Sequence, residues 1–319
     1  MSADAPRPAR LLAWTSDHVE LPLPEGHPFP IAKYRLLREA LLAGGVLAAA
    51  DVTFSDEAPV EWLTTVHDED YVRRALEGAL DPAEVRRLGL PWSPALARRA
   101  RAAAFGTVQS TRAALVHGIA GNLSGGTHHA FRERGEAYCL FHDVAIAITL
   151  LRREGAIARP FVLDLDVHQG NGTAAIFAGD PDVFTYSAHG RHNYPYRKET
   201  STLDVEFADG AGDDEVLAAL ERTVPAALDR HAPDVVLYQA GVDALAEDRL
   251  GRLRMTHAGL AERDRRVFAW CEARALPVAI TAGGGYGRPI EATVEACANV
   301  WRAARESLAR RAALVTPDR

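Results

Sequence analysis

The sequence predicts an α/β fold in which a mostly parallel β-sheet lies between two layers of helices. Short, continuously apolar runs bounded by Gly, Asp or Pro are typical of strands that are buried on both faces of a parallel sheet. Longer segments with helical patterns alternate with these runs, which indicates strands joined by helical crossovers. No internal repeat of roughly 20 to 50 residues is visible, and we expect a single domain over residues 1–319.

The strands and helices are expected in alternation along the chain. The predicted strands are residues 11–15, 161–166, 183–189, 234–240 and 278–281. The predicted helices are residues 95–117, 144–153, 214–230, 257–273 and 288–310. Pro225 is expected to kink the third of these helices, because proline lacks a backbone donor. Sites in such folds form in the loops that follow the carboxyl ends of the strands, so functional side chains are expected there.

Composition excludes several classes of protein. The chain has 36 basic and 43 acidic residues and a net charge of −7, so no basic surface predicts binding to nucleic acid or an anionic membrane. No apolar run approaches the roughly 18 residues that a membrane span needs, and residues 1–10 lack the apolar segment of a secretory signal. Three scattered cysteines do not make a disulfide framework. We expect a cytoplasmic protein, and the use of arginine for nearly all basic residues favours a bacterial source.

Carboxylates and an imidazole follow the second and fourth predicted strands. Asp164, Asp166 and His168 are spaced i, i+2 and i+4, which places them on one face of an extended strand. Asp243 follows the fourth predicted strand. One imidazole and two carboxylates with an open position are typical of a catalytic zinc site, and the hard oxygen ligands make Fe²⁺ the alternative. The competing interpretation is structural: an Asp that caps a helix, and a hydrogen-bonded core histidine.

Two glycine-rich segments carry further candidates. The segment Gly125-Gly126-Thr127-His128-His129 contains two imidazoles, and because imidazole titrates near neutrality either one can serve as general base or acid. The alternatives are that both histidines are exposed loop residues or that one is a metal ligand. The last predicted strand is followed by Gly283-Gly284-Gly285-Tyr286, which lacks the motifs of nucleotide-binding loops. The Tyr286 hydroxyl is a candidate donor to a developing oxyanion, with a packed structural tyrosine as the alternative.

Taken together and in order, these motifs resemble the histone deacetylase (arginase-like) superfamily. The resemblance runs from His27-Pro28 to the helix after Tyr286, and the Asp-Val-His-Gln-Gly-Asn-Gly segment that begins at Asp166 is most similar to the class IV branch and its bacterial relatives. It implies a three-layer α/β/α domain with a mostly parallel eight-stranded sheet. It also implies a zinc-dependent hydrolase that removes acetyl or longer acyl groups from the ε-amine of lysine in proteins or peptides.

The resemblance also implies roles for individual residues. The implied zinc ligands are Asp166, His168 and Asp243, and the implied catalytic residues are His128, His129, Asp164, Asn171 and Tyr286. Among the latter, His129 would be the general base and then the general acid, with Asn171 as its hydrogen-bond partner. The implied substrate channel includes Tyr138, Tyr194 and Gly284, and a potassium site would match Asp164, Asp166, His168, Ser187 and Ala188.

Three other functions remain open at this point. An acetylpolyamine or other small-acylamine amidohydrolase would use the same chemistry, but no inserted loop or acidic pocket narrows the entrance. A dimanganese ureohydrolase of the same fold needs more carboxylates, and Gly170 argues against it. An inactive binding module would have lost Tyr286 or a zinc ligand, and neither is lost. Residues 91–94 contain no acidic residue, whereas other classes of the superfamily have an Asp in this region that holds the substrate backbone. The sequence leaves the acyl length and the oligomeric state undetermined.

Overall fold

The computed structural model describes residues 10–315. Residues 316–319 and residues 1–9, on which the predicted absence of a secretory signal mainly rests, lie outside the described residues. The strands are β1 (Leu12–Thr15), β2 (Val52–Phe54), β3 (Ile119–Asn122), β4 (Pro160–Asp164), β5 (Phe184–Gly190), β6 (Leu203–Phe207), β7 (Val235–Ala240) and β8 (Val278–Ala282). They form one eight-stranded sheet in the order β2-β1-β3-β8-β7-β4-β5-β6. Every pairing between neighbours is parallel, so the predicted α/β fold is confirmed.

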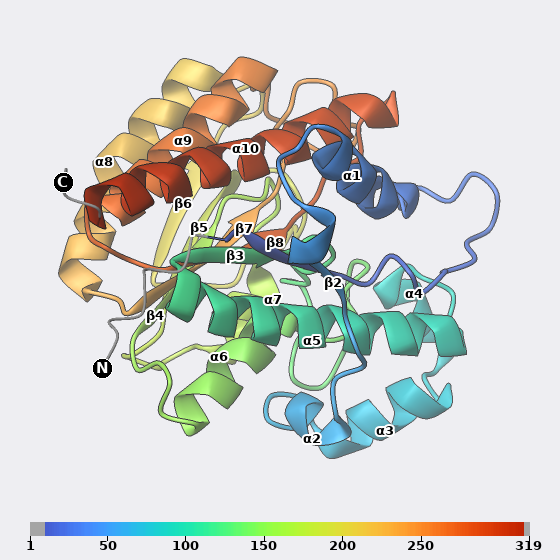
Figure 1. Cartoon of the computed structure of the whole chain (residues 1–319). Helices are drawn as coiled ribbons and strands as arrows, with labels where there is room; N and C mark the ends of the chain where they lie inside the picture. Colours follow the sequence, from blue (N-terminus) through green and yellow to red (C-terminus); the bar gives the residue numbers. More distant parts are fainter. Residues whose placement is uncertain (1–9, 316–319) are drawn as a thin grey trace.

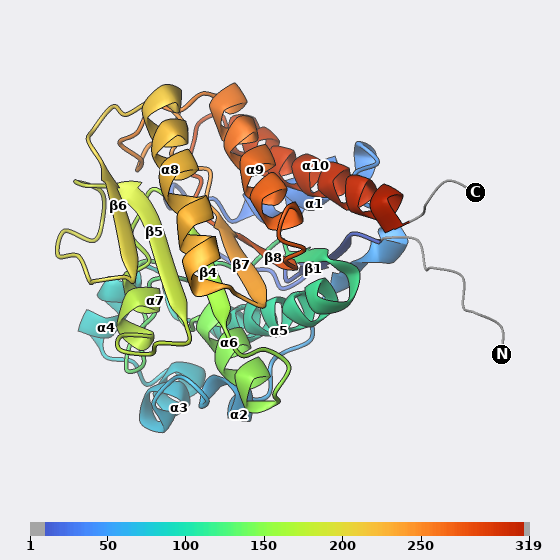
Figure 2. The same ribbon diagram turned by 90° about the vertical axis from the view of Figure 1, so that its left-hand side faces the viewer.

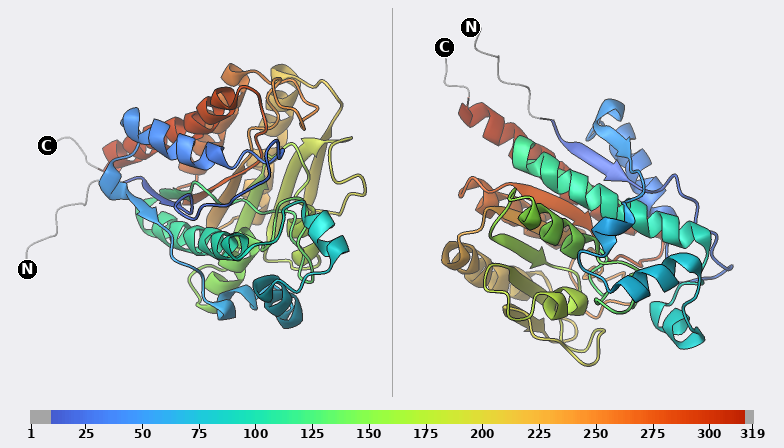
Figure 3. Two further views of the ribbon diagram at one scale, coloured as in Figure 1. Left: turned by 90° about the vertical axis from the view of Figure 1, so that its right-hand side faces the viewer. Right: turned by 90° about the horizontal axis from the view of Figure 1, so that it is seen from below.

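Helices cover both faces of this sheet (Figures 1 and 2). One layer contains α1 (Ala32–Ala43), α8 (Asp213–His231), α9 (His257–Glu272) and α10 (Ile290–Val315). The other contains α2 (Val60–Leu63), α3 (Glu69–Glu77), α5 (Pro94–His117) and α6 (Asp143–Arg153). Shorter helices are α4 (Pro82–Leu88), α7 (Asn171–Ile176) and the 3₁₀ turn Ala49–Asp51. Within residues 10–315, no helix combines the length and the apolarity needed to span a membrane. Figure 3 shows the two layers from two further sides.

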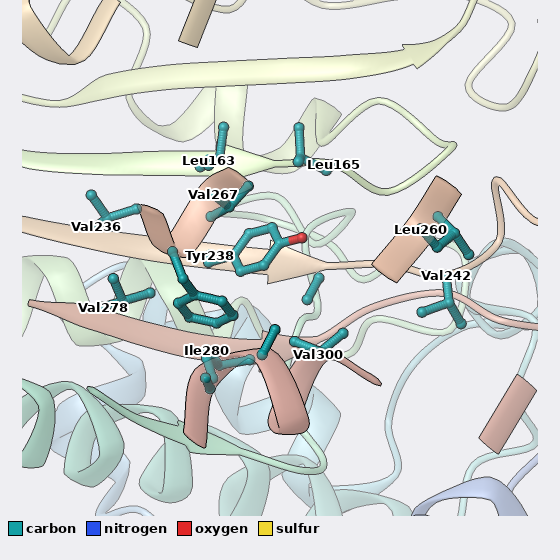
Figure 4. Close-up of a cluster of buried hydrophobic side chains, with 14 of the residues drawn as sticks. Leu163, Leu165, Val236, Tyr238, Val242, Leu260, Val267, Val278, Ile280 and Val300 are labelled. Carbon is teal, nitrogen blue, oxygen red and sulfur yellow. The ribbon is translucent and has the colours of Figure 1, made fainter. Parts of the chain in front are cut away.

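The central strands are buried on both faces because their side chains alternate between two apolar clusters. Val236 and Tyr238 of β7 and Ile280 of β8 pack toward α9 and α10 (Figure 4). Leu237 and Ala279, which alternate with these residues along the two strands, belong to the cluster beneath α5 and α6. Period-two alternation with apolar residues on both sides accounts for the continuous apolar runs in the sequence.

The observed elements differ from the predicted ones in informative ways. All five predicted strands and all five predicted helices are present with bounds shifted by a few residues, and α8 continues through Pro225. The strand predicted over residues 161–166 ends earlier, at Asp164, so the expectation that Asp166 and His168 extend one face of that strand is wrong. The Asp164 side chain accepts a hydrogen bond from the Asp166 amide at 3.1 Å, and Asp166 accepts one from the His168 amide at 3.0 Å. These side-chain bonds replace sheet hydrogen bonds and turn the chain away from the sheet.

Candidate active site

The candidate residues meet at the carboxyl ends of four adjacent strands. β3, β8, β7 and β4 are neighbours in the middle of the sheet. The loop after β3 carries the histidine pair, the loop after β8 carries Tyr286, the loop after β7 carries Asp243, and the loop after β4 carries Asp166 and His168. Parallel strands end at the same edge of a sheet, which brings residues that are distant in sequence into one site.

Asp166, His168 and Asp243 form a compact, buried group. Each offers one ligand atom, and these three atoms lie within 4.8 Å of one another. The His168 Nδ1 atom is 3.0 Å from Asp166 Oδ1 and 3.0 Å from Asp243 Oδ2. Both aspartates are fully buried, and His168 is 8% exposed. One nitrogen and two carboxylate oxygens that converge in this way are a donor set for a divalent metal ion.

The charges of this group also fit a cation. Burial, together with the neighbouring charge of Asp166, raises the pKa of Asp243 to about 7. Burial alone would lower the pKa of His168, but its hydrogen bonds to Asp166 and Asp243 raise it to about 10. The His168 nitrogen that carries this proton lies between two buried carboxylates, and a bound divalent ion would take the place of the proton. The residues present are compatible with a metal site.

Gly284 lets the loop after β8 lie directly against this group. Its amide donates to Asp166 Oδ2 at 2.5 Å. A Cβ atom at this position would lie 1.8 Å from Asp243 Oδ2, a distance that no side chain tolerates. Gly284, which we predicted as part of the channel wall, therefore also bounds the Asp166–His168–Asp243 group through its backbone.

The two adjacent histidines have different partners and different charges. His128 Nδ1 is 2.7 Å from Asp164 Oδ2, and His129 Nδ1 is 2.6 Å from Asn171 Oδ1. Burial alone would lower the pKa of His128, but the carboxylates of Asp164 and Asp166 raise it to about 9. Burial, followed by repulsion from His128, lowers the pKa of His129 well below its usual value. Near neutral pH this histidine pair thus contains one protonated imidazole, His128, and one neutral imidazole, His129.

Glu136, which the sequence analysis did not select, fixes the orientation of Asn171. Its Oε1 atom accepts hydrogen bonds from Asn171 Nδ2, at 3.2 Å, and from the Tyr194 hydroxyl. The Asn171 amide presents its nitrogen to the accepting Glu136 Oε1 atom and its oxygen to His129. The hydrogen of neutral His129 then lies on Nδ1, which leaves the Nε2 lone pair free toward the site. No local sequence pattern indicates this role, because the contact with Asn171 is made across 35 residues.

Two other carboxylates that were not predicted from the sequence hold the loops that carry the histidine pair and Tyr286. Asp143 accepts hydrogen bonds from the amides of Gly126 and Thr127, each at 2.8 Å, just before the histidine pair. Asp248 accepts one from the Tyr286 amide at 2.6 Å. In the sequence Asp143 resembles an ordinary first-turn residue of a helix and Asp248 an ordinary loop residue, so neither is distinguished by its neighbours.

Two adjoining cavities reach the site. The inner cavity is lined by Gly284 and by the metal-site residues Asp166 and His168. The outer cavity is lined by Tyr194 and opens toward the surface. Tyr138 and Tyr286 line both cavities, with ring centroids 6.2 Å apart. Both predicted channel tyrosines therefore lie along one path to the Asp166–His168–Asp243 group.

The residues predicted for a potassium site lie at the β4–β5 boundary. Ser187 of β5 is paired in register with Asp164 of β4, and Ala188 follows it. The Ser187 hydroxyl lies 3.0 Å from His189 Nδ1. Asp166 and His168 lie in the loop that follows β4.

Comparison with known proteins places this arrangement among related sequences and folds. Residues 27–304 match the family model described as histone deacetylase domain. An uncharacterized protein of Picosynechococcus is 43% identical over 285 residues, which cover 89% of this chain and 95% of that protein. The histone deacetylase-like amidohydrolase of Pseudomonas aeruginosa is 30% identical, over 74% of this chain and 66% of that protein. Histone deacetylase 2 of Arabidopsis thaliana is 28% identical, over 82% of this chain and 70% of that protein.

Two solved structures share the fold. The HD domain of HDA15 superposes with a TM-score of 0.78 at 20% identity, covering 96% of this chain and 93% of that one. An HDAC homolog complexed with SAHA superposes with a TM-score of 0.78 at 23% identity, covering 94% of this chain and 89% of that one.

Proposed function

The chain belongs to the histone deacetylase family of hydrolases, and from this premise we propose that it is a zinc-dependent deacylase acting on the ε-amine of acylated lysine in proteins or peptides. The observation that carries the proposal is the buried Asp166–His168–Asp243 group beside one neutral and one protonated imidazole. We propose that residues 1–319 form one catalytic domain. The class IV likeness remains a prediction.

The side chains divide the chemistry of amide hydrolysis among them. Asp166, His168 and Asp243 would hold Zn²⁺, with Fe²⁺ as the alternative, and the bound ion would supply Lewis-acid polarisation of the acyl carbonyl. His129, with its Nε2 lone pair free, would accept a proton from the attacking water and return it to the leaving amine. Tyr286 would donate its hydroxyl hydrogen to the developing oxyanion. Burial and the charges of Asp166 and Asp243 raise the pKa of Tyr286 well above its usual value, which keeps that hydrogen in place.

We also propose K⁺ at the β4–β5 boundary, where Asp164, Asp166, His168, Ser187 and Ala188 would supply side-chain or carbonyl oxygens. Hard oxygen donors suit such an ion. The pairing of Asp164 with Ser187 supports this placement.

Replacing Glu136 by leucine tests the orientation of the Asn171–His129 pair. Without the carboxylate the Asn171 amide can turn over and offer its nitrogen to His129 Nδ1, so we expect kcat to fall about tenfold with little change in KM. Glu136→Gln is the matched variant, because its amide oxygen still accepts from Asn171 and Tyr194, and it should retain most of the activity. Steady-state kinetics of both variants decide the matter. Wild-type kcat in Glu136→Leu would contradict the assigned role, and equal losses in both variants would assign it to the charge rather than to the hydrogen bonds.

The proposed function is tested by turnover of lysine peptides that carry acetyl, butyryl, octanoyl or myristoyl groups, with and without a zinc chelator. We expect chelator-sensitive release of the acyl group, and the preferred chain length will show how far the inner cavity accepts the acyl chain. Acetylated polyamines form a second arm of the assay. Turnover of the polyamines alone would reject the peptide substrate in favour of the small-amine alternative. A ureohydrolase is not favoured, because a Cβ atom at Gly170 would lie 2.3 Å from Asp164 Oδ2 and leaves no room for a further carboxylate.

A further inference from the structure

We propose that the outer cavity selects substrates that carry a carboxylate on the amine side of the scissile amide, such as an acidic residue that flanks the acylated lysine. This inference rests on the proposed deacylase function. The cavity wall contains a group of basic side chains: Arg87, His192, Arg249 and Arg252. Within residues 10–315, no aspartate or glutamate is among the residues that line it. This local excess of positive charge contrasts with the net charge of −7 of the whole chain.

Two of these basic groups already have an anionic partner. Arg252 Nη1 lies 3.0 Å from Asp209 Oδ2, and His192 Nδ1 lies 3.2 Å from Asp209 Oδ1. Asp209 therefore offsets the charge of Arg252. Among these four side chains, Arg87 and Arg249 are therefore the two whose positive charge has no anionic partner in the described part of the chain.

Arg87 and Arg249 are exposed, and neither forms an ion pair with a carboxylate in the described part of the chain. Arg249 Nε instead donates to the backbone carbonyl of Tyr286 at 2.8 Å, which anchors the side chain and leaves its charge without a counterion. Its charge also reaches the channel: burial raises the pKa of Tyr138, and Arg249 opposes that rise. Arg249 thus lies at the junction between the surface and the predicted channel.

The location of these arginines determines which part of a substrate they would meet. His129, Tyr138 and Tyr286 line both cavities, so an acylated side chain that reaches the metal group passes through the outer cavity. Groups on the amine side of the scissile amide would then remain beside Arg87 and Arg249. Guanidinium groups recognise carboxylates through paired hydrogen bonds, and charge complementarity at an entrance also raises association rates.

The test compares acetyl-lysine peptides of one length whose two flanking residues are glutamate, glutamine or lysine. We expect kcat/KM to be highest for the glutamate peptide, about five- to tenfold above the glutamine peptide, with the advantage shrinking as salt is added. Free Nε-acetyl-lysine and its carboxamide form a further arm. A gain for the free acid would show that the recognised carboxylate can belong to the amino acid itself rather than to a neighbouring residue.

Arg87→Gln should lower the ratio of glutamate to glutamine peptide rates toward one, because it removes one of the two arginines that have no counterion. Arg86→Gln is the matched control, because Arg86 is the exposed neighbour on α4, carries the same charge and does not line the cavity. In this variant the ratio of glutamate to glutamine peptide rates should stay at the wild-type value. Turnover of all three peptides without a preference for glutamate would overturn this inference and leave the proposed function standing. Absence of turnover on every acyl-lysine substrate would overturn both.

Discussion

Replacing Asp243 by asparagine is expected to abolish metal binding and to lower deacylase turnover by roughly a thousandfold or more, since metal polarisation of the substrate supplies several kcal/mol of the catalytic effect. The substitution keeps the size of the side chain and removes the negative charge that faces His168 at 3.0 Å. Bound metal is measured by elemental analysis after dialysis, and turnover with an acetyl-lysine peptide. A variant that retains one tightly bound ion and near-normal turnover would contradict the ligand assignment.

Stability measurements separate this loss from misfolding. Because burial and the charge of Asp166 raise the pKa of Asp243 to about 7, folding becomes less favourable as pH rises from the ordinary carboxyl range through 7 and Asp243 ionises in the folded state. Asparagine has no such charge, so at pH 8 the metal-free variant should melt at or above the temperature of the metal-free wild type. Added Zn²⁺ should raise the Tm of the wild type and not that of the variant.

Replacing Tyr286 by phenylalanine is expected to lower kcat by a factor of about 100 to 1,000, the usual effect of losing one oxyanion donor. The ring stays in place between the two cavities, so KM, metal content and Tm should change little. Steady-state kinetics and elemental analysis check these expectations.

Tyr138→Phe removes a second hydroxyl from the same channel and provides the comparison. The two rings lie 6.2 Å apart, but Tyr138 belongs to the channel wall rather than to the loop that follows β8. We expect its loss of kcat to be below about threefold, because it removes no oxyanion donor. Equal losses in the two variants would show that the Tyr286 hydroxyl has no special role.

Much of the fold could be predicted because the long central strands have a clear pattern. β4, β5, β7 and β8 are buried on both faces and read as apolar runs. Three strands were missed for physical reasons. β3 contains only four residues, Ile-Ala-Gly-Asn, with little apolar bulk, whereas β2 and β6 lie at the sheet edges and are partly exposed, so their sequences lack a continuous apolar run.

The candidate site likewise contains residues that could be predicted from the sequence and residues that could not. Residues directly after strands, such as Asp166 and Asp243, could be predicted because a parallel sheet brings the ends of its strands together. This holds for Asp166 even though β4 ends earlier than predicted. Glu136, Asp143 and Asp248 could not be selected, because each acts on the site only through contacts made after folding. Glu136 meets the Tyr194 hydroxyl across 58 residues, a relation that no local pattern encodes.

The proposed function requires one divalent ion, held by Asp166, His168 and Asp243, for amide hydrolysis. It is tested most directly by removing bound metal with a chelator, confirming the removal by elemental analysis, and then adding back one equivalent of Zn²⁺, Fe²⁺ or Mn²⁺ during turnover of an acetyl-lysine peptide. We expect no turnover in the metal-free protein and recovery with a single equivalent of Zn²⁺ or Fe²⁺. Full turnover without metal, or recovery only with two equivalents of Mn²⁺, would contradict it.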